Sequence, residues 1–264
     1  MIAPASRRKQ RGLALFFLLA LIGLVGGFLI INAMNRSGAE LSLARDQKTQ
    51  AALDRAKQAL LTFAATERVE KSMDTTTPPP PAPGNAHNPN RGVPGYLPCP
   101  ELGPPTLFAE GTTAPTCGVS GVSSIGRLPW YTLNTEPPRD GSGECLWYAV
   151  SGTYKYNPNG VNVDPGVSAA SNMMNWDTPG LFDVLASDGS TYLAGGGPST
   201  RAVAVIFAPG AALQGQNRSG AGGAVCGGNY TASNYLESAN GVNNSAVSAV
   251  ANAVTRFIAG QFSN

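Results

Sequence analysis

Residues 13–31, which read LALFFLLALIGLVGGFLII, are the stretch of this 264-residue chain that decides how the rest is interpreted. They contain no charged or strongly polar side chain. At about 1.5 Å rise per residue, a helix of this length covers roughly 28 Å, which is close to the thickness of the hydrocarbon core of a bilayer. The stretch therefore predicts a transmembrane segment, which we place at residues 13–33.

The segment in front of this stretch predicts the orientation of the chain. Residues 1–12 form a short leader that carries Arg7, Arg8, Lys9 and Arg11. Positive charge stays on the cytoplasmic side of a membrane. We therefore expect a single-pass inner-membrane protein with a cytoplasmic N-terminus and a C-terminal domain in the periplasm or at the cell surface. A cleaved secretory signal is the alternative, although its apolar core is usually shorter and ends in an A-x-A-like site, whereas residues 32–35 read NAMN.

The helix is predicted to continue beyond the apolar stretch. Residues 39–67 contain neither Pro nor Gly and are rich in Ala, Leu, Gln, Lys and Arg, which are good helix formers. Leu53, Ala56, Leu60 and Phe63 recur at three- and four-residue spacing, so they form one apolar stripe. We interpret residues 34–70 as an amphipathic helix.

The remainder of the chain has a different composition. Residues 71–95 are rich in proline, which fixes φ and donates no hydrogen bond, so they form an extended linker. Residues 96–264 are predicted to be an exported, β-rich globular domain, with strands over 146–150, 181–185 and 202–207 and a closing helix over 245–262. The expected fold class is α+β: a long N-terminal helix, membrane half plus amphipathic half, packed on an antiparallel β-sheet.

Four cysteines, an even number in a chain that is expected to be exported, indicate two disulfides. Four cysteines allow three pairings, and the sequence does not choose among them. We favour Cys99–Cys117 because it closes a short Pro/Gly-rich loop, which leaves Cys145–Cys226.

Two glycine-containing motifs have both a functional and an ordinary interpretation. Gly23 and Gly27 form a G-x-x-x-G spacing, which lets helices approach closely, but glycine is also simply frequent in membrane helices. The turn at residues 140–144 could offer oxygen atoms to calcium, but it lacks the spacing of an EF-hand loop, and a plain turn is the favoured interpretation.

The composition argues against several classes of function. The net charge is +2 and four of the positive charges lie before residue 12, so no nucleic-acid partner is expected. The single histidine, His87, lies in the proline-rich linker and is poorly placed for nucleophilic catalysis or zinc binding. We predict that the chain is not an enzyme and has no catalytic residue, metal or cofactor.

A basic leader ending in Gly12, an apolar helix that becomes amphipathic, and a β-rich end together resemble the type IV pilins and the pseudopilins of type II secretion. Four motifs, in this order, also resemble those of a group of uncharacterised bacterial pilin-like proteins. They are YLPCPE at 96–101 with the later Cys117, GRLPWYTL at 126–133, LWYAVS at 146–151 and AVIFAPG at 204–210.

This resemblance implies a function and a processing site. A prepilin peptidase would cut between Gly12 and Leu13, and Leu13 would become the methylated first residue of the mature chain. The family usually has Glu as its fifth mature residue, where this chain has Phe17, which favours a minor or tip subunit over a major one. The implied partners are the lipid bilayer, other pilin or pseudopilin subunits and the prepilin peptidase. A membrane-anchored binding or adhesion module outside the cytoplasm that does not polymerise is the alternative.

Overall fold

The structure, a computed structural model, describes residues 11–66, 95–104, 109–115, 117–119, 121–155, 177–220 and 222–260. Side chains of the N-terminal helix are described over 16–26 and 40–66. The chain divides into two compact units, Met1–Gln47 and Lys48–Asn264. The predicted linker at 71–95 and its His87 lie almost entirely outside the described residues, as does most of the leader at 1–12.

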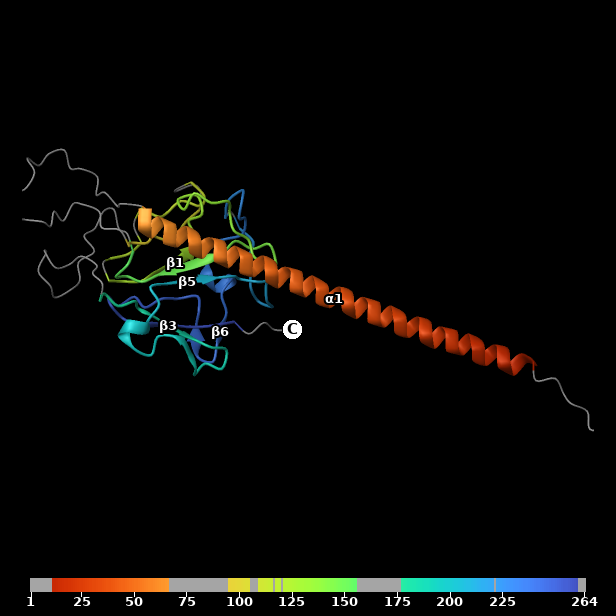
Figure 1. Cartoon of the computed structure of the whole chain (residues 1–264). Helices are drawn as coiled ribbons and strands as arrows, with labels where there is room; N and C mark the ends of the chain where they lie inside the picture. Colours follow the sequence, from red (N-terminus) through yellow and green to blue (C-terminus); the bar gives the residue numbers. More distant parts are fainter. Residues whose placement is uncertain are drawn as a thin grey trace, which may run out of the picture. The chain divides into compact units, whose positions relative to one another are not determined.

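One helix, α1 (Arg11–Thr66), accounts for all the α-helix in the described part of the chain (Figure 1). Its last turn is closed by two further hydrogen bonds, one from a side chain of the helix itself and one from a residue outside it. The Thr66 hydroxyl donates to the Thr62 carbonyl at 2.7 Å, and the amide of Gly95 donates to the Ala64 carbonyl at 2.6 Å.

The membrane prediction requires correction. Within the residues that the structure describes, no helix is both long enough and apolar enough to cross a bilayer. The predicted transmembrane segment at 13–33 and the single-pass inner-membrane localisation are therefore wrong.

A three-stranded antiparallel sheet forms the centre of the second unit. Its order is β1 (Ser124–Arg127), β2 (Trp147–Val150), β5 (Ala204–Phe207). The strands predicted over 146–150 and 202–207 are confirmed. All four residues of β2 are buried, which is expected for a central strand covered on both faces.

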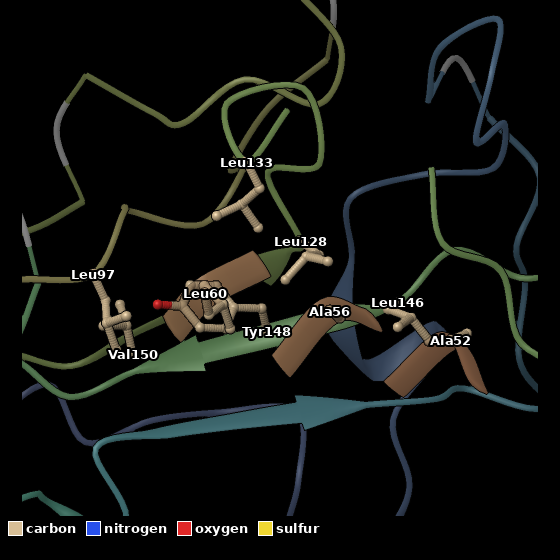
Figure 2. Packing of buried hydrophobic residues seen from close by; sticks show 9 residues of the cluster. All are labelled: Ala52, Ala56, Leu60, Leu97, Leu128, Leu133, Leu146, Tyr148 and Val150. Atoms are coloured by element: carbon tan, nitrogen blue, oxygen red, sulfur yellow. The ribbon is translucent and has the colours of Figure 1, made fainter. Parts of the chain in front are cut away.

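The two faces of β2 belong to different core clusters. Tyr148 and Val150 pack with Ala52, Ala56 and Leu60 of α1, as Figure 2 shows. The intervening residues of β2 lie on the opposite face, because successive side chains of a strand alternate. Trp147 packs with Tyr235 and Leu236, and Ala149 packs with Phe182 and Phe257.

A second sheet has the order β4 (Tyr192–Ala194), β3 (Phe182–Leu185), β8 (Thr255–Ile258). The strand predicted over 181–185 is thereby confirmed as β3. β3 pairs antiparallel with β4 and parallel with β8. The remaining described elements are a small hairpin of β6 (Ser238–Ala239) and β7 (Val242–Asn243) and the 3-10 turns η1 (Pro198–Thr200) and η2 (Ala232–Asn234).

The predicted fold class is wrong in three respects. The membrane half of the helix is not found, and the buried side chains of α1 that the structure describes are confined to Ala52, Ala56 and Leu60. In the residues that the structure describes, the β part forms three small sheets rather than one. One of these sheets is mixed, because β3 and β8 run parallel.

The predicted closing helix at 245–262 is also wrong, since the described part of this segment contains strand β8 and turns. The amide side chain of Asn244 favours a strand over a helix at residues 255–258. It accepts a hydrogen bond from the Ile258 amide and donates one to the Ile258 carbonyl, both at 2.8 Å. The side chain thus satisfies both backbone groups of Ile258, a role that a neighbouring strand would otherwise fill.

Candidate functional site

The apolar surface of α1 in the first unit is the feature most in need of a functional explanation. Every large apolar side chain between residues 16 and 25 is more than half exposed, from 51% for Val25 to 74% for Leu24. The set consists of Phe16, Phe17, Leu18, Leu19, Leu21, Ile22, Leu24 and Val25. A helix that is apolar on all sides is normally buried.

The residues predicted for processing and close helix packing all lie on α1. Gly12 and Leu13 follow Arg11, where the helix begins. Phe17, at the position where the pilin family usually has Glu, is 65% exposed. A Cβ atom added at Gly23 would meet nothing within 4 Å, so the space beside this glycine is open. The surroundings of Gly27 lie outside the described side chains.

The second half of α1 is attached to the sheet by small side chains. Ala52 and Ala56 are 5% and 2% exposed, and a hydroxyl on the same stretch, that of Thr49, accepts a hydrogen bond from the Gly141 amide at 2.9 Å. Of the predicted apolar stripe, Ala56 and Leu60 are buried. Leu53 and Phe63 are only partly buried. Ala52 was not predicted as part of the stripe, although it lies one helical turn before Ala56.

Two disulfides hold the β domain. Cys99 is bonded to Cys117 and Cys145 to Cys226, which is the pairing favoured from loop closure. The first closes a local loop with a sequence separation of 18, and the second joins segments separated by 81 residues. Two bonds of this kind are compatible with a location outside the cytoplasm.

A buried arginine joins β1 to the segment that carries Cys226. The Arg127 side chain donates to the carbonyl groups of Gly222 at 3.0 Å and Asn229 at 2.9 Å, and also to the Gly227 carbonyl. Its guanidinium lies 4.5 Å from the ring centre of Tyr230. Three carbonyl acceptors and an aromatic face compensate for the desolvation of the charge.

A carboxylate completes this buried cluster. The Tyr230 hydroxyl donates to Oε1 of Glu101 at 2.6 Å, and the backbones of Glu101 and Arg127 exchange two hydrogen bonds. Burial raises the pKa of Glu101, and the hydrogen bond from Tyr230 opposes that shift. Burial and the neighbouring Glu101 raise the pKa of Tyr230. The hydrogen bonds of this cluster join distant segments of the same domain, so its geometry indicates a structural role.

A buried lysine supports the first disulfide loop. Lys155 is fully buried, and its ammonium group donates to the Cys117 carbonyl at 2.7 Å. Burial lowers the pKa of Lys155 to about 8. Sequence reasoning overlooked Lys155, Arg127 and Glu101, because a lysine, an arginine or a glutamate in a β-rich domain is ordinarily a surface residue.

The turn considered for calcium is an ordinary turn. The Asp140 carboxylate accepts hydrogen bonds from the amides of Ser142, Glu144 and Gly210, at 2.8, 3.0 and 2.7 Å. Asp188 likewise accepts from the amides of its own turn. In the described part of the chain, no three His, Cys, Asp or Glu side chains gather into a possible metal site.

Comparison with known proteins adds no relative: no family model matches the chain, and no characterised protein or solved structure is significantly similar to it.

Proposed function

We propose that this chain is a structural subunit, a minor pilin or pseudopilin of a type IV pilus or a type II secretion-like system. In this function α1 packs against the helices of neighbouring subunits, and the β domain faces outward. A prepilin peptidase removes the leader between Gly12 and Leu13.

The exposed apolar residues of α1 carry the proposal. Between residues 16 and 25 the large apolar side chains cover every side of the helix. Burial of apolar surface contributes about 25 cal/mol per Å², so an assembly that covers several sides of the helix is strongly favoured. Neighbouring helices supply such a cover, and the open space beside Gly23 lets one of them approach closely.

Phe17 supports a minor rather than a repeating position. In pilins the glutamate expected at this position pairs with the terminal amine of a neighbouring subunit. Phe17 offers only apolar contact area at the joint, with no charge to set the register. A subunit at the tip or in a rare position needs few such joints.

The test uses a photo-crosslinking amino acid, incorporated at Leu24 or at Lys57 in the native host. Leu24 is exposed in the apolar part of α1, whereas Lys57 is exposed on the polar side of the second half of the same helix. We expect crosslinks to another pilin or pseudopilin from position 24 and few from position 57. Equal crosslinking from both positions would contradict specific packing through the apolar part.

Processing gives an independent test. Mass spectrometry of the mature protein should find an N-terminus at Leu13, and Gly12→Asp should leave the leader attached and abolish the crosslinks from position 24. If the wild-type leader is retained and position 24 finds no partner subunit, the chain is instead an exported binding module that does not polymerise.

A further inference from the structure

An open pocket of about 600 Å³ lies on the face of the second sheet that does not carry Phe182 and Phe257. Asp183 of β3 and Arg256 of β8 lie directly opposite each other in the parallel register and contribute to its floor. A pocket of this volume is within the range of small-molecule sites in proteins, and its lining is mainly polar.

Two hairpin turns form the walls of the pocket. The turn between β6 and β7 consists of Asn240 and Gly241, whose φ values of 50° and 76° are left-handed, as a two-residue hairpin turn requires. The Asn240 side-chain amide donates to the Ser187 carbonyl, in the turn between β3 and β4, at 2.9 Å. This hydrogen bond links the two turns that flank the pocket.

One arginine of the pocket is held in place with part of its guanidinium unused. Nε of Arg201 lies 3.2 Å from Oδ1 of Asp183, which also accepts a hydrogen bond from the Gly196 amide. The two Nη groups of Arg201 have no acceptor among the residues that the structure describes. Asp183 is 94% buried at its side chain and acts as a positioning residue for Arg201.

The second arginine is unpaired. Arg256 is exposed, and its side chain makes no hydrogen bond or ion pair with any described residue. The pocket is therefore lined by two guanidinium groups and one carboxylate, which leaves an excess positive charge in it. Asp188, which precedes the lining residue Gly189 in the chain, accepts hydrogen bonds from the amides of Ser190 and Thr191 in its own turn.

The other lining residues favour a sugar over a small inorganic anion as the ligand. Oδ1 of Asn240 has no hydrogen-bond donor within the described part of the chain, so it is available to a hydroxyl group. Leu185, Val242 and Val254 supply an aliphatic surface for C–H groups. The planar guanidinium of an arginine pairs well with a carboxylate. The other lining residues can contact the hydroxyl groups and the C–H groups of a sugar ring.

We propose that this pocket binds an acidic monosaccharide unit, with its carboxylate on Arg201 and Arg256 and its hydroxyl groups near Asn240. The binding site goes beyond the subunit role, because it would give the outward domain a ligand of its own. It does not depend on assembly through α1.

The test is calorimetric titration of the full chain with four probes: glucuronate, N-acetylneuraminate, glucose and inorganic sulfate. At least one of the two sugar acids should bind with a dissociation constant of about 1 mM or tighter, which is modest for a ligand of this size. Glucose lacks the carboxylate and sulfate lacks the ring, so each should bind at least about tenfold more weakly.

Arg256→Gln should weaken binding of the sugar acid by about tenfold or more, because it removes a charge-assisted hydrogen bond. Arg256→Glu should abolish it. Both variants should remain folded, since the side chain is exposed and unpaired. Arg55→Gln, at an exposed arginine of α1, is the matched control and should bind as the wild type does.

Three outcomes would overturn the proposal. They are no binding of either sugar acid, binding of sulfate or glucose as tight as that of the sugar acid, and equal affinity of wild type and Arg256→Gln. None of these outcomes bears on processing at Gly12 or on crosslinking from position 24, so this proposal and the subunit function fail separately.

Discussion

The guanidinium of Arg127 lies 4.5 Å above the ring of Tyr230, and the hydroxyl of that ring donates to Glu101, whose backbone pairs with that of Arg127. One tyrosine therefore contacts both a buried cation and a buried anion. These contacts link β1 to the segment that carries Cys226, and they join residues that are far apart in the sequence. The stability of this part of the domain should depend on it.

Replacement of Arg127 by lysine should lower the free energy of unfolding by about 3–5 kcal/mol, because three carbonyl groups lose their shared planar donor and the new ammonium group is poorly paired. Urea unfolding followed by fluorescence measures the change. Arg55→Lys, at an exposed position of α1, should change the value by less than about 0.5 kcal/mol. A variant at Arg127 as stable as the wild type would show that the cluster is not structural.

Two adjacent leucines test the packing of α1 on the sheet. Leu60 is 5% exposed and Leu61 is 54% exposed. Leu60→Ala should therefore lower the free energy of unfolding of the β domain by about 2–5 kcal/mol, through lost burial and a cavity. Leu61→Ala should cost less than about 1 kcal/mol. Similar losses at both positions would refute the burial of this face of α1.

The two disulfides should differ in their contribution to stability. In the chain-entropy model the loop of 81 residues stabilises more than the loop of 18, by about 1.3 kcal/mol. The double variant Cys145→Ala/Cys226→Ala should therefore have a lower unfolding midpoint in guanidinium than Cys99→Ala/Cys117→Ala. The reverse order would mean that packing around the short loop outweighs chain entropy.

Lys155 should make stability depend on pH above neutrality. Burial lowers the pKa of Lys155 from its ordinary 10.5 to about 8, so between these two values the unfolded chain binds more protons than the folded one. The free energy of unfolding should thus rise as the pH rises from about 8 to about 10.5, by about 1–3 kcal/mol. Below a pH of about 8, Lys155 is charged in both the folded and the unfolded chain. The destabilising effect of burying its charge is therefore fully present there.

The measurement is the difference between wild type and Lys155→Met across that pH window, which cancels the titration of tyrosines and other groups. The methionine variant keeps the volume and lacks the proton, so it should lack this rise. Parallel pH profiles for the two proteins would show that folding does not lower the pKa of Lys155.

Local patterns were sufficient for part of the fold. The absence of Pro and Gly over 39–67 and the apolar run at 13–31 predict helix, and α1 covers the whole run and residues 39–66. Alternating or continuous β-branched and aromatic residues predict β2, β3 and β5. The even number of cysteines predicts two disulfides, and the structure contains two. The helix and the strands depend on neighbours in the sequence, and the number of disulfides follows from the cysteine count, so the sequence determines these features by itself.

Tertiary structure decided what local patterns left open. Val247, Val250 and Val254 have helical spacing, yet β8 forms nearby because Phe257 packs on Phe182 and Asn244 binds both backbone groups of Ile258. Parallel pairing of β3 and β8, the burial of Arg127 and Lys155, and the meeting of Arg201 with Arg256 at one pocket all join distant parts of the chain. The free energy of such contacts comes from burial and from partners that exist only after folding, so no local pattern encodes them.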